Sequence, residues 1–118
     1  MVVKSRAYRR RYIAFLIVSE KPLSRGFLAS KIRDLEIELF GTHGVLFPVG
    51  FNGYVFVLRV PHRLKEDVIK ALMSIDNIYG VKVAIFPLIT SGTIRTLIKK
   101  LEEMRMPTEG LRQRKRRL

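Results

Sequence analysis

The most constraining feature of the sequence is the segment Arg10–Ser19, in which apolar side chains occupy both sets of alternating positions. Successive residues of a strand point to opposite faces of a sheet, so a strand of this kind needs cover on both sides. We therefore expect Arg10–Ser19 to be a central strand. Neither face of the sheet around it can be left wholly to solvent.

A helix is expected to follow this strand. Ser24 can cap its first turn, and Gly41 can end it in the left-handed conformation. The apolar stripe between them has the 4, 3, 4 spacing of one helix face. Its members are Leu28, Ile32, Leu35 and Leu39.

Two strand-like runs come next, Val45–Phe51 and Tyr54–Val60, separated by Asn52 and Gly53. Asn-Gly between two apolar runs is the strongest short-range signal for a type I′ hairpin. The pair is therefore predicted to be antiparallel.

The remainder of the chain predicts a helix, a strand and a last helix. The first helix follows Pro61, ends near Asp76–Asn77 and has the apolar stripe Leu64, Val68, Ala71, Leu72 and Ile75. The strand is Val81–Leu88. The last helix begins near Ser91, and its apolar face is Ile94, Leu97, Ile98, Leu101 and Met104.

The resulting order is βαββαβ plus a C-terminal helix, which predicts an α+β, ferredoxin-like (RRM-like) antiparallel sheet sandwich. In that arrangement the first and third strands are central and the second and fourth are edges. The prolines agree, because Pro48 and Pro87 fall in the second and fourth strands. We expect one domain at residues 10–104, between a basic N-terminal arm (residues 1–9) and a basic C-terminal tail (residues 105–118).

The net charge of +13 is concentrated at the two ends. Residues 1–11 carry five bases and no acid, and residues 105–118 carry six bases against Glu109. A nearly balanced middle with two cationic ends indicates a polyanionic partner, and RNA leads the candidates. The bases expected to contact it are Arg9, Arg10, Arg11, Arg112, Arg114, Lys115, Arg116 and Arg117.

A second candidate contact lies where the fourth strand meets the last helix, at Ser91, Gly92 and Thr93. Free N–H groups and the helix dipole favour an anion at such a start. Arg95, Lys99 and Lys100 could extend this contact along a phosphate backbone, while an ordinary hydroxyl cap on a solvated cationic helix is the alternative.

Tyr54 and Phe56 are two residues apart in the third predicted strand and resemble the stacking aromatics of RNA-recognition motifs. The match is partial, and we favour core or protein-partner contact for both. An independent RRM-like module that binds single-stranded RNA stays open as the alternative function. A ribosomal or chromatin-type protein held by its arms alone is a third.

The sequence argues against a self-sufficient enzyme. It has no cysteine, and His43 and His62 lack the neighbours of a metal site. No catalytic residue and no metal site are expected. Seven acids are predicted on helix surfaces, with no acid and base converging on a pocket: Asp34, Glu36, Glu38, Glu66, Asp67, Glu102 and Glu103.

The longest apolar run, Tyr12–Val18, is too short to span a bilayer, and no cleavage site for a signal peptide follows it. Membrane association is not expected, and a cytoplasmic location is the prediction.

Two stretches, Arg10-Arg11-Tyr12-Ile13-Ala14-Phe15 and Ser91-Gly92-Thr93-Ile94-Arg95, resemble the archaeal ribonuclease P protein component 2 family. The resemblance covers roughly Arg9–Leu101, and from Ser24 to Val60 it is mainly one of pattern. It implies an accessory subunit of a ribonucleoprotein that removes the 5′ leader of precursor tRNA, with RNA as the catalyst.

The same resemblance implies the partners. They are ribonuclease P RNA, precursor tRNA, ribonuclease P protein component 3 and other ribonuclease P protein subunits, and a homodimer within a heterotetramer is compatible with it. No cofactor is expected on the protein, and Mg²⁺ is expected on the RNA.

Overall fold

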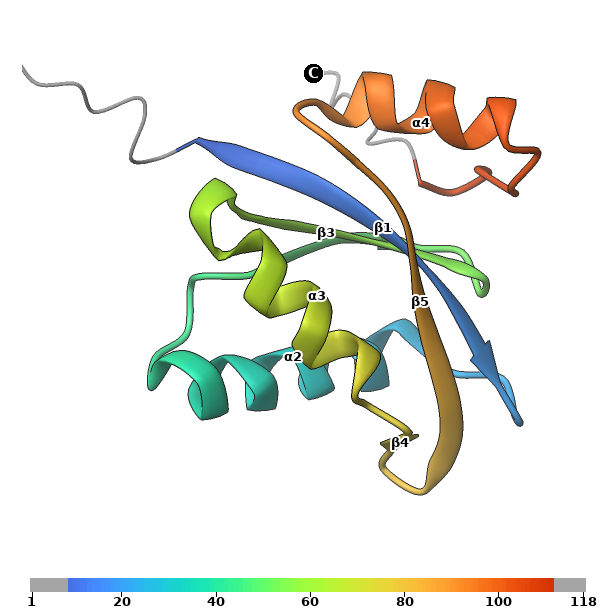
Figure 1. Cartoon of the computed structure of the whole chain (residues 1–118). Coiled ribbons are helices and arrows are strands. Elements are labelled where there is room, and N and C mark those ends of the chain that lie inside the picture. The colour runs from blue at the N-terminus through green and yellow to red at the C-terminus, as the bar shows by residue number, and fades with distance from the viewer. Residues whose placement is uncertain (1–8, 112–118) are drawn as a thin grey trace, which may run out of the picture.

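The computed structural model describes residues 9–111, which form nine elements of secondary structure (Figure 1). In chain order they are β1 (Arg10–Ser19), α2 (Arg25–Phe40), β2 (Phe47–Phe51), β3 (Val55–Pro61), η1 (His62–Leu64), α3 (Lys65–Met73), β4 (Asn77–Ile78), β5 (Val81–Ser91) and α4 (Ile94–Glu103).

The strands form one antiparallel sheet in the order β2-β3-β1-β5-β4. The predicted ferredoxin-like α+β fold is confirmed, and the first and third predicted strands, β1 and β3, are internal. The fourth predicted strand, β5, was expected to be the edge. This is wrong, because the two-residue strand β4 pairs outside it, with Asn77 opposite Lys82 and Ile78 opposite Val81.

The turn between β4 and β5 explains why the extra strand was missed. Both of its central residues have positive φ, 48° at Tyr79 and 91° at Gly80, which is the requirement of a type I′ turn. A tyrosine in this conformation is strained, and its contacts offset the strain. Tyr79 Oη donates to Asp34 Oδ2 at 2.6 Å, and its ring meets Phe27 edge to face at 5.5 Å. The hydrogen bond to Asp34 also raises the pKa of Tyr79.

The hairpin predicted at Asn52-Gly53 is present, but its type I′ geometry is not. Only Gly53 has a positive φ, and β3 begins at Val55 instead of Tyr54. The asparagine side chain dictates this wider turn, since its Oδ1 accepts hydrogen bonds from the N–H groups of Tyr54 (3.1 Å) and Val55 (2.8 Å).

Both strand prolines lie where the ladder is irregular. The β2–β3 register shifts between Pro48 and Gly50, and the β1–β5 register shifts beside the position where Pro87 faces Phe15. Proline lacks the N–H that a regular ladder needs, so these shifts accommodate both residues.

The predicted caps of α2 are confirmed. Ser24 accepts a hydrogen bond from the N–H of Phe27 at 3.0 Å, and Gly41 ends the helix with φ 72°. Two members of the predicted apolar stripes are wrong, because Leu39 and Met104 are exposed. At the end of α2 the neighbouring Phe40 packs against the core instead of Leu39, and Met104 is the residue that follows the last turn of α4.

Helices α2 and α3 cover one face of the sheet, which we name the helix-pair face, and α4 lies on the opposite face, the α4 face (Figure 1). Within residues 9–111 the helix-pair core contains fifteen buried residues, and Phe15, Phe56 and Leu72 are among its largest fully buried side chains. The α4 core contains seven, namely Ala14, Val55, Val57, Leu97, Ile98, Leu101 and Leu111.

The packed chain extends beyond the predicted domain end at residue 104. Leu111 is 1% exposed in the α4 core, and Met106 packs beside it. Asn52 holds the segment after α4 against the sheet, because its Nδ2 donates hydrogen bonds to the carbonyl oxygens of Pro107 (3.0 Å) and Glu109 (3.1 Å). Residues 105–111 are therefore part of the domain.

Glu36, predicted on a helix surface, is 2% exposed, so that prediction is wrong. Its Oε2 accepts hydrogen bonds from the backbone N–H groups of Val45 (2.8 Å) and Leu46 (2.6 Å), and His43 Nδ1 lies 3.4 Å from Oε1. The carboxylate supplies acceptors that the loop before β2 lacks, so it fixes the path of the chain into that strand.

Candidate nucleic-acid interface

The start of β1 and the start of α4, far apart in the sequence, lie side by side. Antiparallel pairing places Tyr12 opposite Ser91, so Arg11 adjoins Gly92. A Cβ on Gly92 would lie only 3.6 Å from Arg11 Nη1. The structure thus brings together the two segments that the sequence singled out for anion contact.

The turn into α4 has hydrogen-bond donors to spare. Thr93 caps the helix through a bond from the N–H of Thr96 (3.1 Å), and the buried Ser91 hydroxyl accepts weakly from the N–H of Thr93 (3.5 Å). Within residues 9–111, the backbone N–H groups of Gly92, Ile94 and Arg95 have no hydrogen-bond acceptor. An incoming anion could accept from them.

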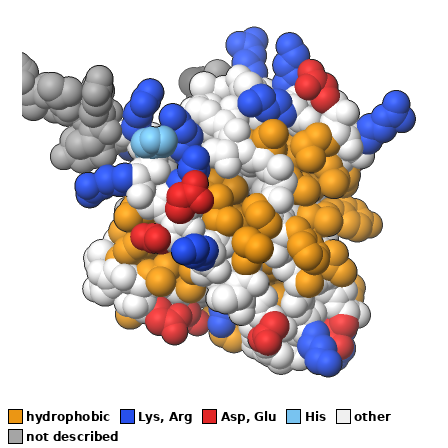
Figure 2. All heavy atoms as spheres, viewed as in Figure 1, with side chains coloured by type: hydrophobic (Ala, Val, Ile, Leu, Met, Phe, Trp, Pro, Cys, Tyr) orange, Lys and Arg blue, Asp and Glu red, His pale blue; other side chains and the backbone are white. Residues whose placement is uncertain are grey.

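The bases of α4 lie away from its packed face. Leu97, Ile98 and Leu101 are buried against the sheet, whereas Arg95 and Lys99 are exposed. Lys100 is partly buried. Figure 2 shows Lys and Arg side chains gathered over α4 and around the start of β1. The helix that closes the α4 core therefore also presents a cationic outer surface.

A second group of bases surrounds the start of β1, where Arg9 and Arg10 are exposed. Its other members, Arg59, Arg63 and Lys65, come from β3, η1 and α3 and were missed by the sequence prediction. The available signal was Arg59, a charge at the end of an apolar strand that ends beside β1. Nothing in the sequence pattern indicated that η1 would return Arg63 and Lys65 to the same place.

The pKa of His62 reflects the positive charge of this group of bases. Its backbone N–H donates to the carbonyl of Arg9 at 2.8 Å. Desolvation lowers the pKa of His62 below its ordinary value, and the charges of Arg11, Arg9 and Lys65 lower it further. Accumulated positive charge disfavours a further cation here, and it would attract a polyanion for the same reason.

The structure separates the two candidate aromatics. Phe56 is 2% exposed and packs against Phe15 and Phe51, at ring-centroid distances of 6.5 and 6.3 Å. Tyr54 lies in the turn and is 60% exposed. A stacking platform needs both rings at the surface, so the observed positions do not favour the RRM-like alternative.

The predicted tail contacts Arg112, Arg114, Lys115, Arg116 and Arg117 lie outside the described residues, as do residues 1–8 of the N-terminal arm. Over the described part of the chain, no three His, Cys, Asp or Glu side chains are grouped as for a metal ion. No helix in that part has the length and apolar character to cross a membrane.

Comparison with known proteins gives two concordant matches. The family model of the Rpp14/Pop5 family matches residues 11–102. The chain is also 30% identical, over 99 residues, to the protein named ribonuclease P protein component 2 of Archaeoglobus fulgidus, covering 81% of this chain and 91% of that protein. The resemblance carried by the two terminal stretches is confirmed.

Proposed function

Because the chain belongs to the Rpp14/Pop5 family, we propose that it is a protein subunit of ribonuclease P, acting in the removal of the 5′ leader from precursor tRNA. Similarity to a ribonuclease P component over most of both chains supports this assignment. The single structural observation that carries it is the cationic surface on which the start of β1 meets the start of α4.

In this proposal the protein assists and the RNA catalyses. Arg9, Arg10 and Arg11 neutralise phosphates beside the sheet, and the exposed bases of α4 extend the contact along the RNA backbone. Neutralisation lowers the repulsion between RNA segments that must approach each other to build a reactive fold. Mg²⁺ held by the RNA supplies the metal chemistry.

A protein partner, ribonuclease P protein component 3, is proposed for the part of the sheet that α4 leaves uncovered. Val18 and Phe86 are exposed there. A groove lined by apolar residues such as Leu16 and by polar residues such as Lys21 runs beside Tyr54, which is exposed in the β2–β3 turn. Exposed apolar side chains clustered on one face are typical of protein interfaces.

The direct test is precursor-tRNA cleavage by an archaeal ribonuclease P RNA at moderate Mg²⁺. Three mixtures are compared: RNA alone, RNA with component 3, and RNA with component 3 and this chain. Cleavage rescued only in the third mixture is the expected result. Unchanged cleavage on adding the chain contradicts the proposal.

The double substitution Arg95→Ala and Lys99→Ala tests the α4 contact. The measurement is RNA binding at several salt concentrations. If the chain neutralises about five phosphates, the logarithm of the RNA association constant falls with the logarithm of the salt concentration at a slope near −4. The double variant should flatten that slope by about 1 to 2. The matched control is Arg33→Ala with Lys70→Ala, two exposed bases on α2 and α3. Equal slopes for both double variants would remove α4 from the interface.

A further inference from the structure

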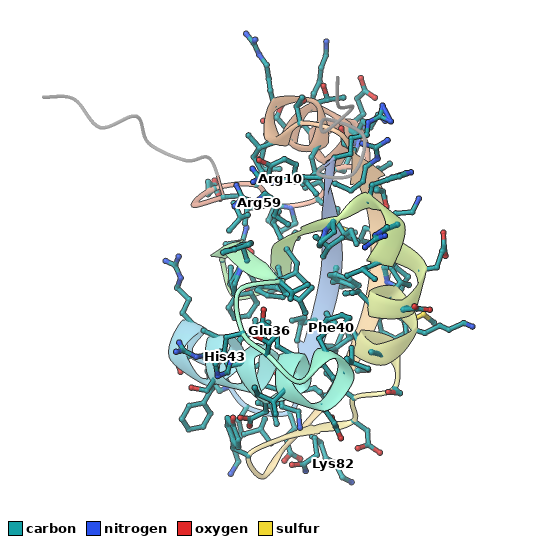
Figure 3. The ribbon with its side chains drawn as sticks, turned by 90° about the vertical axis from the view of Figure 1, so that its left-hand side faces the viewer. Arg10, Glu36, Phe40, His43, Arg59 and Lys82 are labelled. Atoms are coloured by element: carbon teal, nitrogen blue, oxygen red, sulfur yellow. The ribbon has the colours of Figure 1, made fainter. Side chains whose placement is uncertain are left out.

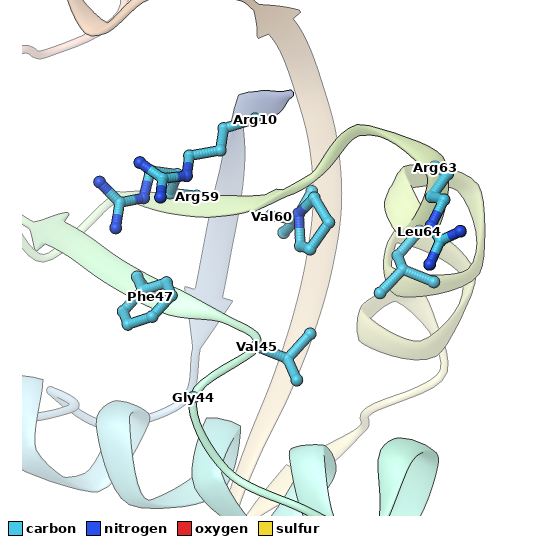
Figure 4. A pocket seen from close by; sticks show the side chains of 9 residues that line it. Arg10, Gly44, Val45, Phe47, Arg59, Val60, Arg63 and Leu64 are labelled. Atoms are coloured by element: carbon cyan, nitrogen blue, oxygen red, sulfur yellow. The ribbon is translucent and has the colours of Figure 1, made fainter. Parts of the chain in front are cut away.

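A hollow of about 290 Å³ opens at the end of the sheet where β1 begins and β3 ends (Figure 4). Its lining divides into two chemical kinds. Three residues are arginines, Arg10, Arg59 and Arg63. The others are Gly44 and the apolar residues Val45, Phe47, Val60, Pro61 and Leu64.

Arg59 is the most informative of these residues. Its guanidinium carbon lies 4.7 Å from the centroid of the Phe47 ring, the residue opposite it in the β2–β3 ladder. Its Nε is buried and has no hydrogen-bond partner in the described structure. A buried donor left unpaired costs about 1–3 kcal/mol, so such groups are normally satisfied. Within residues 9–111 no hydrogen bond or ion pair holds the Arg59 guanidinium, so this group as a whole lacks an acceptor that a ligand could supply to its outer N–H groups.

Charge gives the sign of that acceptor. No aspartate or glutamate lines the hollow, and none within residues 9–111 forms an ion pair with Arg10, Arg59 or Arg63. Figure 4 shows Arg10 and Arg59 together above Phe47, with Arg63 on the opposite side of the opening. Three guanidinium groups around one opening, none with a carboxylate in the lining, match an anion with several acceptor oxygens, as phosphate has.

The apolar lining indicates more than a bare phosphate. Phe47 is 42% exposed, and Val45 and Leu64 add aliphatic surface. Aromatic rings and guanidinium planes are the surfaces on which unpaired RNA bases stack. The volume of about 290 Å³ lies at the lower limit of the range for small-molecule pockets, which suits a ligand of the size of one nucleotide.

We propose that this hollow binds a single unpaired nucleotide of the RNA, with its phosphate on Arg10, Arg59 and Arg63. The base lies against Phe47. The site rests on the proposed function, which supplies RNA as the partner, and it adds a defined point of contact to the sequence-independent surface of α4. Glu36 supports the site indirectly, because it holds Val45 in the wall of the hollow.

The experiment is an NMR titration of the full chain with adenosine 5′-monophosphate, adenosine, inorganic phosphate and a hexaglutamate peptide. The monophosphate should shift the backbone amide signals of Phe47, of residues 59–60 and of residues 62–64. It should bind at least tenfold more tightly than adenosine or phosphate alone, since only it meets both halves of the lining.

Two variants test the two halves. Arg63→Gln removes an exposed guanidinium and Phe47→Ser removes the ring, and each should weaken binding of the monophosphate about tenfold. Arg63 is exposed on the short η1, so folding should survive its loss. The matched control is Lys82→Gln, at the opposite end of the sheet (Figure 3), which should bind like the unmodified chain.

Equal binding by Arg63→Gln, Phe47→Ser and Lys82→Gln would overturn the site, as would amide shifts confined to other regions. Tighter binding of hexaglutamate than of the monophosphate would overturn it in favour of an acidic protein segment. The cleavage experiment is independent. A chain that supports cleavage but does not prefer the monophosphate overturns the site alone, and one that prefers it in the hollow but does not support cleavage overturns the proposed function alone.

Discussion

The two faces of the sheet are closed in different ways. The helix-pair face is covered by α2 and α3, which belong to the βαββαβ unit itself, and its core is about twice the size of the other. The α4 face is covered by one helix and by Leu111 from the segment after it. Part of this second face stays open, with Val18 and Phe86 exposed.

The difference separates stability from recognition. On the helix-pair face the large side chains are buried, and a change there acts on folding. On the α4 face one helix both buries Leu97 and Leu101 inward and presents Arg95 and Lys99 outward. RNA binding is therefore expected to depend on helix α4, which the smaller of the two cores holds in place.

The largest effect is expected at Phe15, which is fully buried between α2, α3 and the sheet. Phe15→Ala should lower the free energy of unfolding by about 3–5 kcal/mol, because it removes a large apolar side chain and leaves a cavity. Urea denaturation followed by circular dichroism measures the change. A loss below 1 kcal/mol would show that the helix-pair core does not dominate stability.

Leu111 tests whether the α4 face needs the segment beyond the helix. Leu111→Ala should cost about 2–3 kcal/mol by the same measurement, less than Phe15→Ala because the segment can rearrange near its end. Met104→Ala is the control, since that side chain is exposed on the same stretch and should cost less than 1 kcal/mol. Equal losses would remove Leu111 from the cooperative core.

Glu36 tests a polar contribution to the helix-pair side. Glu36→Gln keeps an acceptor but removes the charge that strengthens the bonds from Val45 and Leu46, so a loss of about 1–2 kcal/mol is expected. Glu38→Gln, an exposed neighbour, is the control and should be neutral. Faster amide hydrogen exchange at Val45 and Leu46 in Glu36→Gln alone would locate the effect.

The smallest effect concerns His62, at the end of the sheet where the cationic groups meet. Its lowered pKa means that the folded state binds a proton less readily than the unfolded chain, so its contribution to stability is lost as pH falls below 6.5. Bound phosphates would offset the positive charges of Arg9, Arg11 and Lys65 and would therefore raise the pKa of His62. RNA affinity should then increase slightly as pH falls from 7 to 6.

NMR titration of the His62 ring protons, with and without a short RNA, measures this shift. In Arg11→Gln the pKa of the free protein should rise, because one of the repelling charges is gone. An unchanged His62 titration on adding RNA would place the bound RNA away from this end of the sheet.

Much of the fold could be predicted because its signals are local. Two-sided hydrophobicity identified β1 as central, and Ser24 and Gly41 marked the ends of α2. The errors arose where a tertiary contact altered a local preference. Hydrogen bonds to the Asn52 side chain stabilise a wider turn than the expected type I′ turn. Contacts of Tyr79 stabilise the turn at Tyr79-Gly80, which the sequence pattern did not predict.

The candidate interface shows the same division. Runs of basic residues at the chain ends and a glycine before a helix are visible in the sequence, and they led to Arg11, Gly92 and Arg95. Arg59 and Arg63 belong to no such run, because Arg59 stands alone at the end of an apolar strand and Arg63 is separated from Lys65 by Leu64. Only the return of η1 beside β1 gives these two a common role.

Four strands, three helices, the resemblance to a family, the excess of positive charge and the lack of cysteine could all be read from the amino-acid sequence, whereas η1 and β4 could not. The resemblance rests on the two short motifs at Arg10–Phe15 and Ser91–Arg95, and the other features follow from composition and short-range periodicity, which need no knowledge of distant neighbours. Only the folded chain shows that Glu36 is buried, that Leu111 completes a core and that three arginines line one hollow. Each of these depends on segments far apart in the chain, and their meeting is set by strand pairing and helix packing.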